Sequence, residues 1–171
     1  HGIHWAQNAL GVLACIDALG LSVYDAAGRL ASCPPPKGRG GRLTGHYQGC
    51  KIKLIDDSYN ASPASMVAAF ASMTTTAPTI MILSEMRELG DATAIEHAAL
   101  IPHINGLSPR LVIALGSAMH DALDGLDDAI VAIAAPSTTA AVQVLEDVVE
   151  DGDIIFIKGS LGSGSWRVRD A

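Results

Sequence analysis

Short apolar runs alternate with amphipathic segments after residue 50, and this alternation constrains the fold more than any other feature of the chain. The apolar runs predict strands at residues 51–56, 79–83, 111–115, 129–133 and 153–158. The segments between them predict helices at residues 63–75, 93–105, 117–123 and 137–150, with Ser62 and Thr93 as N-terminal caps and a break at Pro102. Helical crossovers between apolar strands are typical of a Rossmann-like α/β fold, a mostly parallel sheet with helices on both faces.

A proline- and glycine-rich stretch, residues 31–42, separates this pattern from what precedes it. Two helices are expected before it, at residues 5–19 and 23–31. Prolines and glycines are excluded from helix interiors and central strands, so the stretch predicts a linker and divides the chain into residues 1–36 and 37–171. Gly38, Gly40 and Gly41 are expected to serve as a hinge between the two parts.

Composition excludes several classes of protein. The 171 residues carry a net charge of −7, which argues against a general nucleic-acid binder. The three cysteines form no CxxC pair, as expected in a reducing, cytosolic compartment. The longest charge-free run, residues 58–84, is rich in Ser and Thr and contains prolines, so no membrane span is expected. The six histidines form no tight ligand set, and structural roles are expected for His97 and His103 rather than a metal site.

The densest polar cluster, residues 54–66, lies where a predicted strand ends and a helix begins, a position where open parallel sheets bind ligands. Asp56 and Asp57 are expected to point to opposite faces, so that only one of them faces a given pocket. Two interpretations remain open. The cluster is ordinary turn and cap chemistry, or Tyr59 and Asn60 offer a surface to adenine while a carboxylate accepts ribose hydroxyls.

Two further segments carry candidate ligand-binding residues. Arg39 lies between two glycines, and two interpretations of it remain open. Its guanidinium reaches a ribose or phosphate, or it is a solvated linker residue. Lys158 precedes a Gly- and Ser-rich loop that could hold a carboxylate or phosphate. The GxxxxGK[ST] phosphate-binding motif is absent from the chain, so this loop is not a P-loop.

Taken in order, the strings GRG, LIDDSYNASPASM, ILSEMRELG and IFIKGS resemble the C-terminal domain of the Mur ligase family. The opening HGIHWAQNALGVLACIDALG resembles the last long helix of that family's central ATP-binding domain. The DDSYNASP wording resembles the branch that adds D-alanyl-D-alanine to UDP-N-acetylmuramoyl-tripeptide through an acyl phosphate. The resemblance implies a monomeric, cytoplasmic bacterial enzyme of peptidoglycan precursor synthesis that uses ATP and Mg²⁺.

The resemblance also implies roles for individual residues. Asn8 would contact adenine, Arg39 and Asp57 would hold the ribose, and Tyr59 and Asn60 would lie beside the base. Lys158 and Ser160 would lie near the peptide end of the UDP-linked substrate or the incoming dipeptide. The P-loop and the Mg²⁺ ligands would precede residue 1. This chain would therefore supply a nucleoside-clamping lid, with no catalytic residue or metal site of its own, and would be inactive alone.

The sequence departs from the family pattern at four places, two of which are Trp5, where an Asn is common, and Leu161, where an Arg often follows Ser160. Ser62 stands where the family usually has a second Asn, and Ser84-Glu85-Met86 stands where Gly-Asp-Met is usual. The roles of residues 84–86 are open for this reason. Two alternatives stay beside the ligase hypothesis: a stand-alone Rossmann-like binding module without catalysis, and a sibling Mur ligase that adds another amino acid.

Overall fold

The computed structural model describes residues 3–30, 32–73 and 78–171. The chain forms two compact units, residues 1–35 and 36–171. The first contains the helices α1 (Ile3–Ala18) and α2 (Val23–Leu30), as predicted. The end predicted for the second helix at residue 31 lies outside the described residues. No helix in the described part of the chain is long and apolar enough to cross a bilayer.

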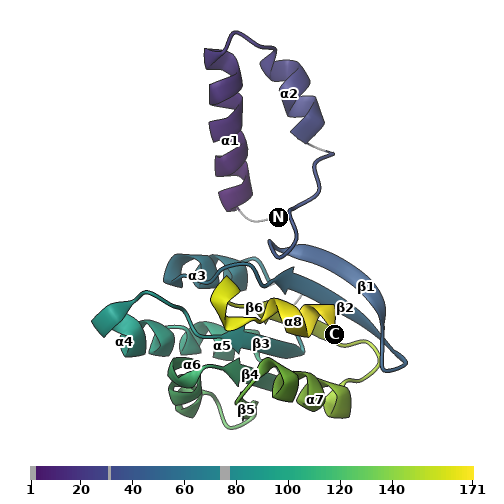
Figure 1. The fold of residues 1–171 in the computed structure, drawn as a ribbon, viewed down its shortest axis with the longest axis vertical. Helices are drawn as coiled ribbons and strands as arrows, with labels where there is room; N and C mark the ends of the chain where they lie inside the picture. The colour runs from purple at the N-terminus through teal and green to yellow at the C-terminus, as the bar shows by residue number, and fades with distance from the viewer. Residues whose placement is uncertain (1–2, 31, 74–77) are drawn as a thin grey trace. The chain divides into compact units, whose positions relative to one another are not determined.

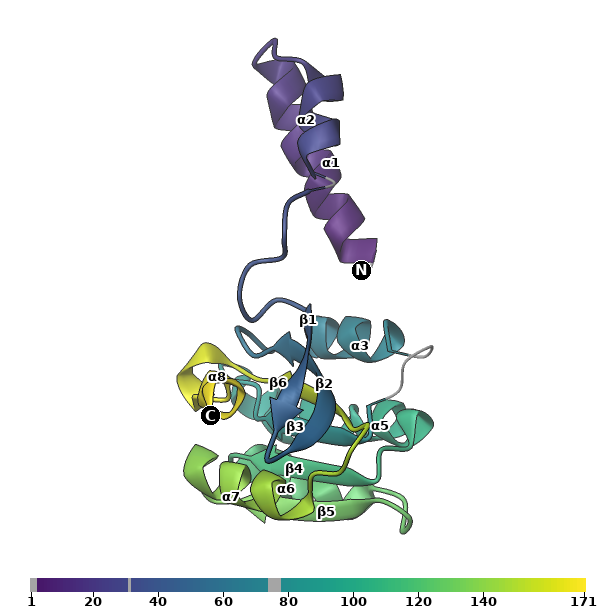
Figure 2. The same cartoon turned by 90° about the vertical axis from the view of Figure 1, so that its right-hand side faces the viewer.

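The second unit is built on one six-stranded sheet with the strand order β1-β2-β6-β3-β4-β5 (Figure 1). Its strands are β1 (Gly41–Tyr47), β2 (Cys50–Asp57), β3 (Ile80–Ser84), β4 (Leu111–Leu115), β5 (Val131–Ala135) and β6 (Ile154–Lys158). Among the strands of the described residues, β1 and β2 pair antiparallel as a hairpin at one edge of the sheet, and the other neighbouring pairs are parallel (Figure 2). The mostly parallel α/β fold is therefore confirmed.

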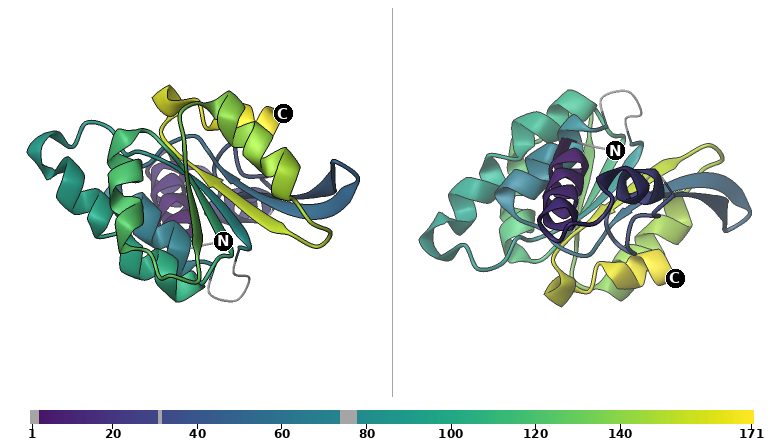
Figure 3. Two further views of the ribbon diagram at one scale, coloured as in Figure 1. Left: turned by 90° about the horizontal axis from the view of Figure 1, so that it is seen from below. Right: turned by 90° about the horizontal axis from the view of Figure 1, so that it is seen from above.

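Helices cover both faces of this sheet (Figure 3). One face carries α3 (Pro63–Ala71), α4 (Thr93–Ala98), α5 (Ile101–Leu107) and α6 (Ser117–Ala122). The other carries α7 (Thr138–Val148) and α8 (Trp166–Asp170). Short 3₁₀ turns occupy Gly90–Ala92, Leu123–Gly125 and Leu161–Ser163.

Alternation along the buried strands supplies two apolar cores, one on each face. Met81, Leu83, Val112 and Phe156 belong to the core under α3, α5 and α6. Ile80, Ile82, Ile113, Ile155 and Ile157 belong to the core under α7 and α8. Because central strands are covered on both faces, their sequences read as continuous apolar runs, and this is why they were predictable.

The sequence missed two elements, assigned one helix cap wrongly, and placed β5 at residues 129–133, two residues before its observed position. Strand β1 occupies part of the predicted linker, which therefore ends at Gly40, and α8 was not predicted. The predicted cap at Thr93 is wrong: a 3₁₀ turn leads into α4, and the Thr93 hydroxyl donates back to the Gly90 carbonyl at 2.7 Å. The predicted Ser62 cap is confirmed. The segment predicted as one helix is interrupted, but at residues 99–100, so Pro102 lies in the first turn of α5. Helix α3 ends at Ala71; residues 74 and 75, also predicted helical, lie outside the described residues.

Candidate functional site

The candidate site lies where the carboxyl ends of β2, β6 and β3 come together. The chain runs from β2 to β3, β4 and β5, then returns through α7 on the opposite face to place β6 between β2 and β3. In open α/β sheets ligands bind at such a reversal of strand order, outside the carboxyl ends of the strands. The predicted residues Asp57 and Lys158 face each other in the register of β2 and β6.

Asp56 and Asp57 point to opposite faces of the sheet, as their alternation predicted. Asp56 is buried: Oδ1 accepts the Ser58 hydroxyl at 2.6 Å, and Oδ2 accepts the Gly38 N–H at 2.8 Å. Arg169 of α8 also reaches Asp56 Oδ2, at 3.3 Å. Asp56 therefore ties the start of the second unit, the turn after β2 and the C-terminal helix together, and its carboxylate is fully engaged.

Asp57 lies on the α3 side and pairs with Lys158. The Lys158 ammonium donates to Asp57 Oδ2 at 2.6 Å and to the main-chain carbonyl of Asn60 at 3.0 Å. The lysine side chain is 2% exposed and the Asp57 side chain 22% exposed. A buried charge is tolerated only when it is paired and hydrogen-bonded, and both conditions are met here. The structure thus joins three of the predicted residues in one cluster.

Arg39 and Tyr59 form a second contact beside this cluster. The Arg39 guanidinium carbon lies 4.2 Å from the centroid of the Tyr59 ring, a cation–π arrangement, and Tyr59 is 43% exposed. The Tyr59 N–H donates to the Gly38 carbonyl at 3.0 Å. Gly38 has a φ of +76°, and a Cβ there would lie 3.0 Å from both Tyr59 N and Tyr59 Cβ. Gly38 is therefore a fixed point against Tyr59, unlike the free hinge expected of it.

Charged residues of the linker end and α8 support the same region. Lys37 lies 3.3 Å from Asp170, and Arg169 pairs with the same carboxylate at 2.7 Å. The hydrogen bond from Arg169, aided by one from Lys37, lowers the pKa of Asp170 to about 2, although burial acts in the opposite direction. Sequence reasoning missed Arg169, because the five-residue helix that carries it is too short to show a periodic pattern.

The loops after β3 and β6 meet beside Ser160. The Ser160 N–H donates to the Ser84 hydroxyl at 3.2 Å. Within the described part of the chain, the buried Ser160 hydroxyl has no hydrogen-bond partner. The neighbouring Met86 N–H donates to Nε2 of the fully buried His97 at 2.8 Å, and Nδ1 of that ring donates to the Thr93 carbonyl at 2.7 Å. His97 is thus a structural histidine in the neutral form.

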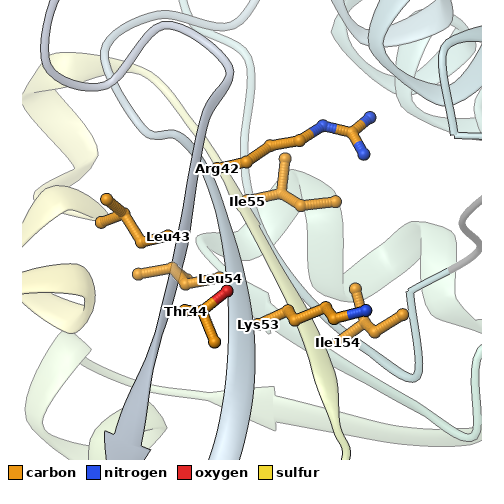
Figure 4. Close-up of a pocket in the computed structure, with 7 residues that line it drawn as sticks. All are labelled: Arg42, Leu43, Thr44, Lys53, Leu54, Ile55 and Ile154. Atoms are coloured by element: carbon orange, nitrogen blue, oxygen red, sulfur yellow. The ribbon is translucent and has the colours of Figure 1, made fainter.

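A shallow hollow of about 220 Å³ lies on the hairpin strands, with Arg42 and Lys53 beside Ile55 and Ile154 (Figure 4). None of the predicted site residues lines it. The hollow is therefore distinct from the cluster at the strand ends.

Comparison with known proteins decides the family. The family model described as "Mur ligase, glutamate ligase domain" matches residues 41–161, more than half of the chain. The chain belongs to the Mur ligase family.

The two curated relatives described here have the same protein name. UDP-N-acetylmuramoyl-tripeptide–D-alanyl-D-alanine ligase from Rickettsia prowazekii (strain Madrid E) is 32% identical over 161 residues, which cover 93% of this Mur ligase chain and 35% of the relative. The protein of that name from Mycobacterium tuberculosis (strain ATCC 25618 / H37Rv) is 30% identical over 200 residues, covering 99% and 38%. The chain thus spans little more than a third of the length of these relatives.

Solved structures agree with this assignment. Crystal structure I of MurF from Acinetobacter baumannii matches with a TM-score of 0.78 and 27% identity, covering 99% of this Mur ligase chain and 37% of the other. The MurF ligase of Thermotoga maritima, solved in complex with ADP, matches with a TM-score of 0.69 at 21% identity, covering 92% and 35%, and shows the shared fold.

The predicted site residues of this Mur ligase fall into two groups. One group lies around the turn after β2 and comprises Arg39, Asp57, Tyr59, Asn60 and Lys158. Ser160 lies two residues after Lys158 in the chain. Asn8 lies in α1 of the other compact unit, so its adenine contact stays a prediction. The assignment of residues 1–36 to a central ATP-binding domain likewise stays a prediction.

Proposed function

We propose that this chain is the C-terminal part of an ATP-dependent ligase that joins D-alanyl-D-alanine to UDP-N-acetylmuramoyl-tripeptide in the bacterial cytoplasm, a step of peptidoglycan precursor synthesis. The names of the relatives support the substrates. The observation that carries the role of this chain is the juxtaposition of Arg39, Tyr59 and Asp57 around one turn at the strand ends. That set of groups suits a nucleoside.

Each side chain around the turn is proposed to contact a different part of the nucleoside. The exposed Tyr59 ring provides a flat face beside which adenine lies. Asp57 Oδ2 is held by Lys158, and the other oxygen of this partly exposed carboxylate accepts ribose hydroxyls. Arg39 reaches the same ribose, and the Asn60 side-chain amide and Asn8 contribute beside the base. Ser160, whose hydroxyl has no hydrogen-bond partner among the described residues, faces the peptide end of the UDP-linked substrate or the dipeptide.

The residues of this chain fit a nucleoside better than a metal ion. In the ranges 3–30, 32–73 and 78–171, no three His, Cys, Asp or Glu side chains gather as a metal ion requires. Asp57, the acid of the turn, is already paired with a lysine. We therefore assign Mg²⁺, which would neutralise phosphate charge, and the triphosphate to protein outside this chain.

In the proposed reaction the γ-phosphoryl group of ATP is transferred to the terminal carboxylate of the tripeptide, which forms an acyl phosphate and ADP. The dipeptide amine then attacks the acyl carbon, an amide bond forms, and phosphate leaves as the amine loses a proton. The turn after β2 acts by holding the nucleoside in place and excluding water around it.

The test is Arg39→Ala in the full-length protein, assayed by release of phosphate. The account expects the KM for ATP to rise about tenfold, as loss of one contact to a charged group would give. Lys37→Ala removes a cation two residues away that pairs with Asp170, and it should leave that KM unchanged. An unchanged KM for ATP in Arg39→Ala would remove this residue from the nucleoside site.

A further inference from the structure

We infer that Lys158 is a positioning residue for the nucleoside, acting through Asp57 and Asn60, and that it does not contact the peptide substrates. The inference rests on the proposed function, because it assigns a purpose to the geometry of the Asp57 carboxylate. It differs from the role near the peptide end that the family resemblance implies for this lysine.

The position of the ammonium favours this role. Lys158 ends β6, where the register places it opposite Asp57 of β2 and opposite Leu83 of β3. Its side chain is 2% exposed, so a peptide or phosphate could reach the ammonium only by displacing its present partners. Two of its three N–H donors are accounted for, by Asp57 Oδ2 at 2.6 Å and the Asn60 carbonyl at 3.0 Å.

These two bonds fix both ends of the nucleoside turn. One orients the Asp57 carboxylate at the end of β2, and the other holds the main chain at Asn60, three residues further on. Tyr59 lies between these anchors, and its own N–H is held by Gly38. The carboxylate that accepts the ribose and the ring beside the base are therefore set in their relative positions by a single buried ammonium.

A purely stabilising role explains a lysine here less well. A buried ion pair seldom stabilises a fold more than apolar side chains of similar volume would. The neighbouring residues of β6, Phe156 and Ile157, are buried and apolar, so an apolar residue at position 158 would continue the core. What the lysine adds is a defined direction for the carboxylate and the carbonyl, a property that matters for ligand geometry.

The structure also offers a matched control. Arg110 and Asp153 form a second ion pair of similar length, 2.7 Å, in which the acid is the shielded partner at 5% exposure and the arginine is 36% exposed. Arg110 precedes β4 and Asp153 precedes β6, so this pair lies at the amino ends of the strands, the opposite edge of the sheet. Breaking it removes an ion pair from the same sheet without touching the candidate site.

The experiment compares Lys158→Met, Lys158→Gln, Asp57→Asn and Arg110→Met in the full-length ligase, with KM measured separately for ATP, the UDP-linked tripeptide and the dipeptide. Lys158→Met is expected to raise the KM for ATP about tenfold and to leave the other two within about twofold. The KM for ATP of the double variant Lys158→Met with Asp57→Asn should not exceed that of the single variant with the higher KM, because both substitutions remove the same Lys158–Asp57 interaction. Lys158→Gln, which keeps a donor for Asn60, tests the same point if the Met variant fails to fold. Arg110→Met should lower thermal stability and leave all three KM values unchanged.

Four outcomes would overturn the inference. A rise in the KM for the dipeptide or the UDP-linked substrate, with ATP unaffected, would make Lys158 a substrate contact. KM values like those of Arg110→Met would make its role structural only. If Asp57→Asn leaves the KM for ATP unchanged, the proposed nucleoside site fails and the inference falls with it. If the KM for ATP rises in Asp57→Asn but not in the Lys158 variants, the inference about Lys158 is overturned and the proposed nucleoside site stands.

Discussion

Replacing Gly38 with alanine should destabilise the second unit more than replacing Gly40, although both glycines have a positive φ, +76° and +73°. An added Cβ at Gly40 meets nothing within 4 Å, whereas at Gly38 it lies 3.0 Å from the main-chain nitrogen of Tyr59. A left-handed conformation costs a non-glycine residue roughly 1–2 kcal/mol, and overpacking adds about 1–3 kcal/mol. The loss of unfolded-state freedom is the same in both variants and cancels in the comparison.

The expected losses of unfolding free energy are about 1 kcal/mol for Gly40→Ala and about 3 kcal/mol for Gly38→Ala. With a urea dependence of about 2 kcal/mol per M, the two midpoints should differ by about 1 M. Each compact unit contains one of the two tryptophans, so Trp166 fluorescence in a Trp5→Phe background reports on the second unit alone. Equal midpoints for the two variants would refute the claim that Gly38 is anchored against Tyr59.

Three further predictions concern stability and turnover. Burial raises the pKa of Asp153, but the hydrogen bonds from Arg110, Thr79 and the Glu150 amide outweigh it, and the net effect is a lowered pKa. The ionised Asp153 carboxylate therefore stabilises the fold above the ordinary pKa of an aspartate. This stabilisation is lost as the pH falls through the lowered pKa of the folded protein. Asp153→Asn should therefore cost more unfolding free energy at about pH 7 than at about pH 2; equal costs in urea titrations at both would contradict this. Asp56→Ala leaves the Arg169 guanidinium without its buried partner and should cost about 3 kcal/mol in the same titration, and a loss within error of zero would show that Asp56 is not structural. The 171-residue chain alone should show no release of phosphate from ATP, and turnover by the pure chain would place catalytic groups within it.

The sheet could be predicted from the sequence because its central strands have apolar residues on both faces. The runs at Ile80–Ser84, Leu111–Leu115 and Ile154–Lys158 are buried, except for the half-buried Ile154, and they stand out from polar loops. Strand β1 could not be found in this way, because most of its residues are exposed. It is an edge strand and pairs with β2 on one side. Edge strands carry their pairing information in the main chain, which leaves little trace in the side chains.

The candidate site was predictable in part. The alternation of Asp56 and Asp57 follows from strand geometry, and it separates a buried structural acid from a partly exposed one. The pairing of Asp57 with Lys158 depends on the strand order. The two residues are 101 positions apart in the chain and meet because β6 lies beside β2. The contact of Arg169 with Asp56 depends in the same way on where α8 docks.

The central claim is that the turn after β2 holds a nucleoside, and a crystal structure of the full-length protein with ADP tests it most directly. The account predicts ribose hydroxyls within hydrogen-bond distance of Asp57, with Arg39 beside the same sugar and the base next to Tyr59. ADP bound elsewhere, with Asp57 and Arg39 free of the ribose, would contradict it.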